Sequence, residues 1–197
     1  MSERAGARRS VVPNTRATVA MTVSTPDLAT IHAEMERARG EFHALIAKSS
    51  PADLARLSNG TRWTNRELLF HMLLGYLVTR NLIPLVKIVS RLPTPVRRGF
   101  AALLNTGTRP FDQINYWGSR AGGRALTPRR MLRWFDGVVS SLHRHLDHES
   151  RATLQRCMAF PSRWDPYFAD WMSLADAYHY PTLHFDHHKR QLTVSLD

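Results

Sequence analysis

Two histidines at helical spacing, with a third far upstream, constrain the fold of this chain more than any other feature. His184 and His188 are four positions apart, so on a helix their imidazoles lie on one face, one turn apart. His71 lies in an earlier segment with its own helical pattern. If the two helices pack face to face, three imidazoles can share one metal ion and leave a coordination position open. The sequence therefore predicts a helical fold in which these two segments are neighbours.

Start signals and apolar spacing place the predicted helices. Thr64 and Glu67 form a capping-box pattern, and Thr127-Pro128 combines a cap with a proline in the first turn. Apolar residues then recur at helical spacing. We predict helices over about 25–48, 64–81, 127–148 and 167–192. We expect Pro181 to kink the last helix or to begin a new helical segment there.

The connection over residues 83–126 is far longer than an ordinary loop, and we expect a short helix within 95–104. Between Pro84 and Arg130 it holds nine Lys or Arg and one acid, Asp112. Three interpretations of this charge stay open. It lines a site and binds carboxylates or phosphates, it is a solvated face, or it binds nucleic acid or an acidic lipid surface. Two helices, a long basic crossover and two more helices predict an all-α bundle.

The formal net charge of +11 fits an anionic partner, and we expect a small anionic ligand. Aromatic residues accompany the cations of the crossover, but no nucleic-acid recognition motif does, so we expect no nucleic-acid binding. The apolar stretch 82–86 beside the cations fits contact with a membrane surface, with the bundle or with a second subunit. We expect a homodimer.

Two short blocks carry a resemblance to a known family. The segment 63–71, WTNRELLFH, resembles the W-[ST]-x-x-E-x-L-x-H block of the DinB/YfiT-like superfamily, and 184–191, HFDHHKRQ, is similar to its H-x-x-x-H-[RK]-x-Q block. Their order, and the long crossover between them, agree with that family's four-helix bundle. The resemblance implies that His71, His184 and His188 bind a divalent metal ion, usually zinc and sometimes nickel. Characterised relatives include thiol-dependent S-transferases and a maleylpyruvate isomerase, which use thiols such as mycothiol or bacillithiol.

The predicted function is therefore a metal-dependent transferase that activates a low-molecular-weight thiol. The alternative is a non-catalytic metal-binding or ligand-binding protein on the same scaffold. Glu67, one turn before His71, either caps its helix or accepts an imidazole N–H. His187 competes with His188 as a ligand, and the family pattern favours His188. Tyr180, one turn before His184, is interpreted as a buried aromatic residue rather than a substrate contact.

Residues 1–22 are rich in Arg, Ser and Thr, and we expect a disordered basic tail there, with the bundle domain over 23–197. Pro13 and Arg16 interrupt any apolar core of a signal peptide. The one cysteine, Cys157, is expected to be a small apolar filler, and it allows no intramolecular disulfide. We therefore expect a cytoplasmic protein. Charged residues and Pro84 within 68–89 favour a buried helix over a membrane span.

Overall fold

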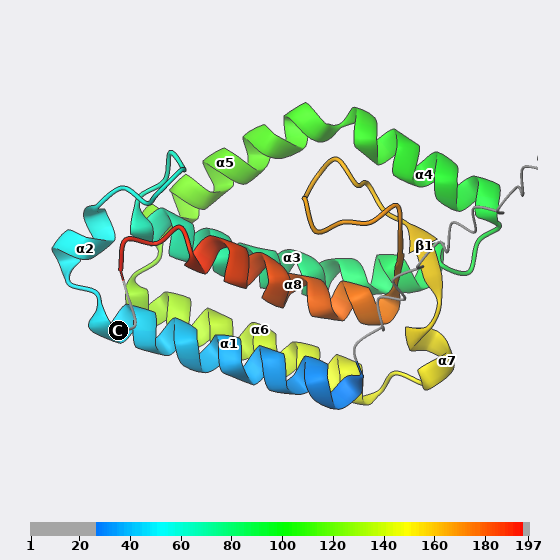
Figure 1. The fold of residues 1–197 in the computed structure, drawn as a ribbon, viewed down its shortest axis with the longest axis horizontal. Coiled ribbons are helices and arrows are strands. Elements are labelled where there is room, and N and C mark those ends of the chain that lie inside the picture. Colours follow the sequence, from blue (N-terminus) through cyan, green and yellow to red (C-terminus); the bar gives the residue numbers. More distant parts are fainter. Residues whose placement is uncertain (1–26, 195–197) are drawn as a thin grey trace, which may run out of the picture.

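The computed structural model describes residues 27–194, which form a four-helix bundle with an additional helical layer on one side (Figure 1). The bundle helices are α1 (Leu28–Lys48), α3 (Asn65–Val89), α6 (Pro128–Asp147) and α8 (Leu174–Lys189). They contact one another in a ring, α1 against α6, α6 against α3, α3 against α8 and α8 against α1. The prediction of an all-α bundle is confirmed. The predicted tail over 1–22 lies outside the described residues.

Each bundle helix begins at a side-chain cap that satisfies a free backbone N–H. Asp27, Thr64, Thr127 and Ser173 accept from the backbone near the start of α1, α3, α6 and α8. The apolar faces then meet in a dense aromatic centre. Phe42 of α1 stacks on Phe135 of α6 with ring centroids 4.3 Å apart. Burial of these faces is the main stabilising term of the bundle.

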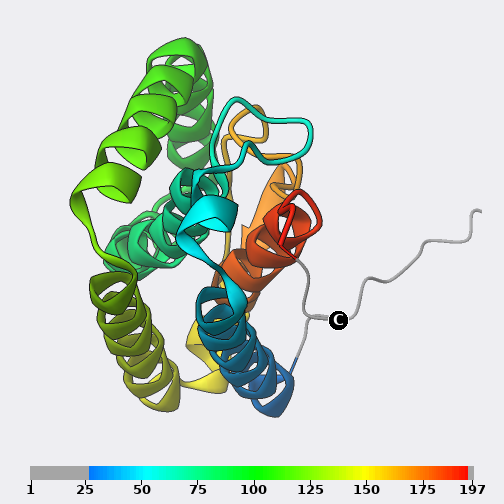
Figure 2. The same cartoon turned by 90° about the vertical axis from the view of Figure 1, so that its left-hand side faces the viewer.

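Two helices form the crossover. α4 (Thr94–Thr106) and α5 (Thr108–Ala125) stand outside the bundle beside α3, and we call them the crossover layer (Figure 2). The predicted short helix is therefore part of a layer that is helical almost throughout. Two short helices, α2 (Pro51–Ala55) and α7 (Arg151–Leu154), lie in other connections. Strands β1 (Cys157–Ala159) and β2 (Trp171–Ser173) pair antiparallel, and the loop 160–170 between them reaches the crossover layer.

Three local predictions are wrong. α3 runs on to Val89 because Pro84 lies on its exposed side, where water can bond the carbonyl that proline leaves unpaired. α8 begins at Leu174, since residues 167–173 form a loop and strand β2, and it continues through Pro181 without a new start. Cys157 is exposed at the start of β1, so it fills no core space.

Among the described residues, α3 alone is long and apolar enough to cross a membrane by length and composition. Of its most apolar window, 39% is buried inside the protein. α3 contacts α5, α6 and α8, and it buries polar residues such as Asn65 and Glu67. These contacts make α3 the central helix of the fold. A central helix that packs against several others is also long and apolar, so length and composition alone do not mark α3 as a membrane span.

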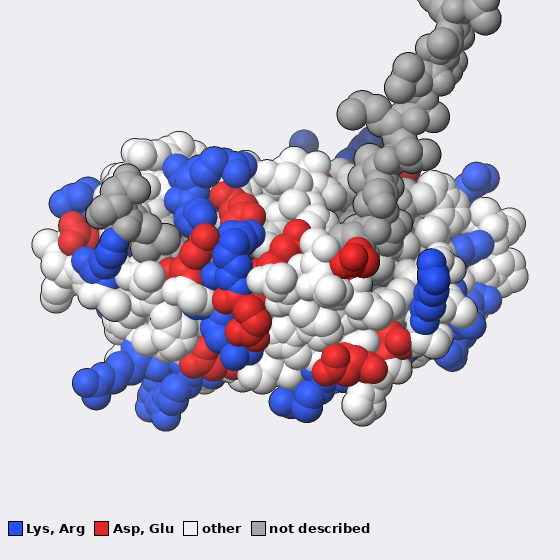
Figure 3. Space-filling view, turned by 60° about the horizontal axis from the view of Figure 1, so that its bottom comes forward, with Lys and Arg blue, Asp and Glu red and all other residues white. Residues whose placement is uncertain are grey.

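Charges of both signs mix on the face that carries α1 (Figure 3). Arg37 forms a two-pronged pair with Asp186, and Lys189 lies 2.9 Å from Glu41. These pairs join α1 to α8 across the surface, where each contributes at most about 1 kcal/mol. The bundle face that carries α1 therefore has both positive and negative side chains, whereas the charged side chains of the crossover are mostly arginines.

Candidate metal centre

The fold brings the three predicted histidines together from two helices. His71 comes from α3, and His184 and His188 come from α8. His71 Nε2 lies 3.1 Å from His184 Nε2 and 3.1 Å from His188 Nε2. One nitrogen from each ring lies within 4.8 Å of the other two. Two nitrogens that each sit about 2.1 Å from a zinc ion are about 2.8 to 3.4 Å apart, so the two distances from His71 Nε2 suit a shared cation.

Two of the imidazole rings have a hydrogen-bond partner at Nδ1, the nitrogen that points away from the cluster. His71 Nδ1 lies 3.0 Å from Ser119 Oγ, and His188 Nδ1 lies 2.7 Å from Gln191 Oε1. When each Nδ1–H donates to its oxygen, the lone pair is left on Nε2, which points into the cluster. Ser119 comes from α5, so the crossover layer supplies one of these two orienting contacts.

A glycine makes room for the third ring. His184 Nδ1 is buried and has no hydrogen-bond partner. A Cβ added at Gly75 on α3 would lie 2.6 Å from this nitrogen, closer than side-chain contacts allow. Because position 75 carries no side chain, α8 can bring His184 against α3. On its Nδ1 side, packing against α3 rather than a hydrogen bond therefore orients this imidazole.

The buried rings are held neutral, as metal ligands must be. Burial lowers the pKa of His71 well below its usual value, and neighbouring His188 and His187 lower it further. Burial and the charges of His71, His188 and His187 also lower the pKa of His184. Burial lowers the pKa of His188 to about 4, with Gln191 acting in the opposite sense. Protonation of these three imidazoles is therefore disfavoured near neutral pH.

The donor set fits a divalent cation. His71 Nε2 faces two other Nε2 atoms, and when all three carry lone pairs a cation between them relieves their mutual repulsion. Imidazole suits zinc and nickel among the common metals. His71, His184 and His188 would hold such an ion, and they would leave at least one coordination position for another ligand.

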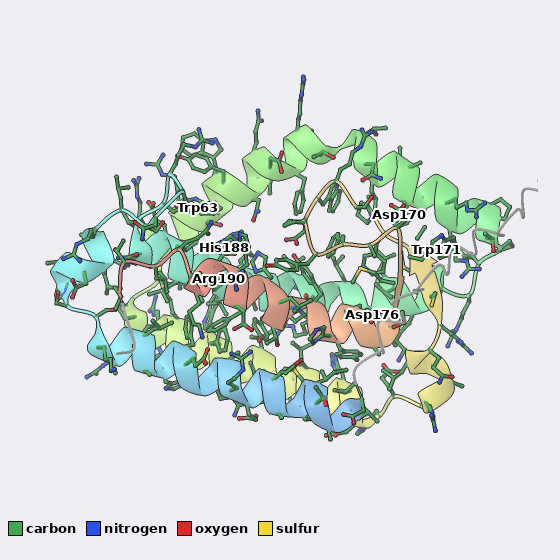
Figure 4. All side chains as sticks on the ribbon, in the orientation of Figure 1. Trp63, Asp170, Trp171, Asp176, His188 and Arg190 are labelled. Atoms are coloured by element: carbon green, nitrogen blue, oxygen red, sulfur yellow. The ribbon has the colours of Figure 1, made fainter. Side chains whose placement is uncertain are left out.

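Aromatic side chains form one wall of the cluster. Trp63 stacks on His71 with centroids 4.5 Å apart. It also lies near His188 (Figure 4), and these two rings meet in a T-shaped arrangement. Its Nε1 donates to the backbone carbonyl of Tyr116 on α5. Trp63 therefore joins the loop before α3 to the crossover layer, and it shields the His71 ring from solvent.

A cavity of about 350 Å³, here called the main cavity, opens from the cluster between α3, α8 and the crossover layer. The three histidines lie in its wall, together with His187, Asp165 and Tyr180. The rest of the wall is mostly apolar. Among the described residues that line it there is one carboxylate, Asp165, and no lysine or arginine. The crossover layer thus contributes Phe100, Leu104 and Phe111 to the main cavity instead of its cations.

The structure resolves the alternatives for the neighbouring residues. Glu67 Oε2 accepts from the backbone N–H of Thr64, and its Oε1 accepts from Arg124 Nε, so it caps α3 and anchors α5 instead of orienting an imidazole. His187 lies outside the cluster, with Nδ1 3.2 Å from the Tyr167 hydroxyl. Tyr180 is only partly buried, and its hydroxyl donates to Asp165 in the cavity wall. Tyr180 therefore belongs to the wall of the cavity and not to the bundle core.

Other histidines have structural partners. His43 pairs with Asp136, and His179 pairs with Glu34. His32 stacks on His143, and each of these rings also faces a carboxylate. These contacts tie α1 to α6 and α8, so these four histidines have structural roles between the bundle helices.

The sequence profile of the DinB superfamily matches residues 34–192. The chain belongs to the DinB superfamily. The match covers the four bundle helices except the first residues of α1, and it includes both histidine blocks. No curated protein and no solved structure matches the chain. The architecture of this DinB-superfamily protein is therefore shown by its own structure and by the family profile.

Ser119 is the site residue that the sequence did not indicate. It lies in the crossover with no motif around it, and only the packing of α5 on α3 brings it to His71. Gln191 is different, because it already forms part of the second histidine block and stands three positions after His188. A search for side chains that can accept an imidazole N–H within one turn of each ligand would have found it.

Proposed function

We propose that this DinB-superfamily protein is a metal-dependent transferase that activates a small thiol at His71, His184 and His188. The observation that carries the proposal is the convergence of three neutral Nε2 atoms at the end of a cavity. A divalent metal ion bound there lowers the pKa of a thiol or water in its open position and so supplies a nucleophile near neutral pH. Zinc is the first candidate and nickel the second.

A transferase needs two binding sites that meet where the bond forms, and two hollows meet beside the cluster. A second pocket of about 410 Å³, here called the side pocket, shares Trp63 and Asn115 with the main cavity. Its remaining wall includes polar side chains, among them Arg62 and Asp112. We assign the polar body of the thiol, of the mycothiol or bacillithiol type, to the side pocket, and the electrophilic substrate to the main cavity.

The residues around the cluster suit proton transfer. The thiol sulfur forms a bond to the electrophilic carbon, a leaving group departs with the bonding electrons, and the thiol proton goes to a base. Asp165 lies in the cavity wall and accepts a hydrogen bond from Tyr180. Burial raises the pKa of Asp165, which makes its carboxylate a better proton acceptor. We assign this role to Asp165.

Cobalt substitution separates this proposal from the alternative of a non-catalytic metal-binding protein. Addition of mycothiol or bacillithiol to the cobalt-substituted protein is expected to produce a new sulfur-to-cobalt absorption band. The band should persist in His145→Ala, because His145 is exposed on α6, away from the cluster. A cobalt spectrum that no thiol alters would favour the non-catalytic alternative. The homodimer and the cytoplasmic location also remain predictions.

A further inference from the structure

The main cavity is long and runs along one stripe of each helix that borders it. On α3 its wall extends from His71 to Val86, fifteen positions that span about 22 Å at the helical rise. On α8 it extends from Ala177 to His188, eleven positions or about 16 Å. A cavity of about 350 Å³ with this length is narrow. Its shape suits an extended molecule better than a compact one.

The polar groups of the main cavity gather at the histidine end. Tyr180 lies beside His184, with ring centroids 5.8 Å apart, and it holds Asp165 there. Toward the other end, α3 contributes Leu82 and Val86, and α4 contributes Phe100. One end of the cavity can therefore bind a polar or reactive group, whereas the remainder, apart from Thr79, offers mainly apolar surface.

Apolar side chains also border the opening of the cavity. Val78, Leu82 and Leu85 line it and are 36 to 40% exposed, so the cavity communicates with solvent along this side of α3. Exposed apolar residues at an opening lower the cost of admitting an apolar chain from water.

From this shape and polarity we propose that the main cavity binds a small molecule with one polar, reactive end and a long apolar chain. The reactive end lies at His71, His184 and His188, and the chain extends along α3 toward Val86. This substrate class is defined by its apolar chain, whereas the net charge suggested a small anionic ligand. The reaction at the histidine end rests on the proposed function. Binding of the apolar chain does not require the metal.

Binding of the neutral fluorescent probe N-phenyl-1-naphthylamine to the metal-free protein, with displacement by n-alkanols from octanol to tetradecanol, tests the proposal. Each added methylene that enters the cavity is expected to tighten binding about threefold to fourfold. Leu104→Trp fills the main cavity and should abolish displaceable probe binding. Leu103→Trp is the matched control, since Leu103 is the neighbouring residue on α4 and is 67% exposed. This variant should bind the probe like the wild type.

Val78→Phe provides a second block if Leu104→Trp does not fold, because Val78 lines the same cavity from α3. His184→Ala/His188→Ala should keep chain-dependent binding even if it loses metal, which separates failure of the metal site from failure of this inference. An affinity that does not depend on chain length would overturn the proposal. Equal probe binding in Leu103→Trp and both cavity variants would overturn it too.

Discussion

The four-helix bundle and the crossover layer are both helical, but they bury their residues very differently. α6 alone buries six apolar residues in the core, including Phe135 and Leu142. In the crossover layer, α4 buries only Ala101, and α5 buries only Ser119 and Gly123. Ser119 nevertheless contacts His71 directly. The comparison indicates that the bundle supplies most of the stability, while the crossover layer closes the site and shapes the cavity.

Small residues explain how the layer can lie so close to α3. A Cβ at Gly122 would lie 2.1 Å from the Phe70 ring, and one at Gly123 would lie 2.7 Å from Glu67 Cα. α5 can therefore reach α3 closely enough for Ser119 to contact His71. Close approach is achieved with little buried apolar area, so the layer is well positioned but weakly stabilised.

The largest expected effect separates the two regions by stability. Phe135→Ala should lower the free energy of unfolding by about 3 to 5 kcal/mol, because the ring is fully buried among other aromatics. Phe111→Ala in the crossover layer should cost about 0.5 to 1.5 kcal/mol, since it mainly loses its stack on Trp164. Urea denaturation measures both, and equal losses would show that the crossover layer belongs to the stabilising core.

A second substitution tests the close packing of α8 on α3. Gly75→Ala places a methyl group against His184 and should destabilise the protein by about 1 to 3 kcal/mol while weakening metal binding. Gly40→Ala is the control, since a Cβ there meets nothing within 4 Å. This control should stabilise α1 by up to about 1 kcal/mol. Thermal melts measure the stability of both variants, and zinc titration measures their metal affinity. Wild-type stability and zinc affinity in Gly75→Ala would contradict this packing of His184 against α3.

Ser119→Ala tests whether the crossover layer serves the metal centre. Loss of the oxygen that orients His71 should weaken metal binding about 10-fold to 100-fold, with little change in stability. Competition with a chelator gives the dissociation constant. Ser140→Ala on α6 should leave that constant unchanged, because the Ser140 hydroxyl contacts Arg39 and no ligand. If both variants bind metal like the wild type, Ser119 only fills space.

The smallest effect is a pH dependence of the metal-free protein. The pKa values of His71 and His184 are lowered on folding, so the unfolded chain binds protons that the folded chain does not. The contribution of these two histidines to the free energy of unfolding is therefore complete well above pH 6.5 and is lost as the pH falls through that value. Between pH 7 and pH 6 the expected loss is about 0.7 kcal/mol for each such histidine. Urea denaturation at these pH values should show a smaller loss in His184→Gln, and an equal loss would exclude His184 as a source.

The sequence predicted the helices of the bundle, and it predicted that His71, His184 and His188 lie together. Both predictions start from local patterns. Caps such as Thr64 and Thr127 mark helix starts, and the spacing of His184 and His188 is a property of one helix. The crossover layer was harder to predict, since its helices bury little and neither begins at a side-chain cap. Ser119 and the main cavity depend on contacts between segments distant in the chain, which no local pattern specifies.

The metal content of protein purified without a histidine tag tests the central claim most directly. The wild type should contain about one equivalent of zinc or nickel, the single ion that three imidazoles can hold. His184→Ala/His188→Ala should lose it, while His145→Ala should retain it because His145 lies outside the cluster. Wild-type protein that contains no metal and takes up none on addition of zinc would contradict the account.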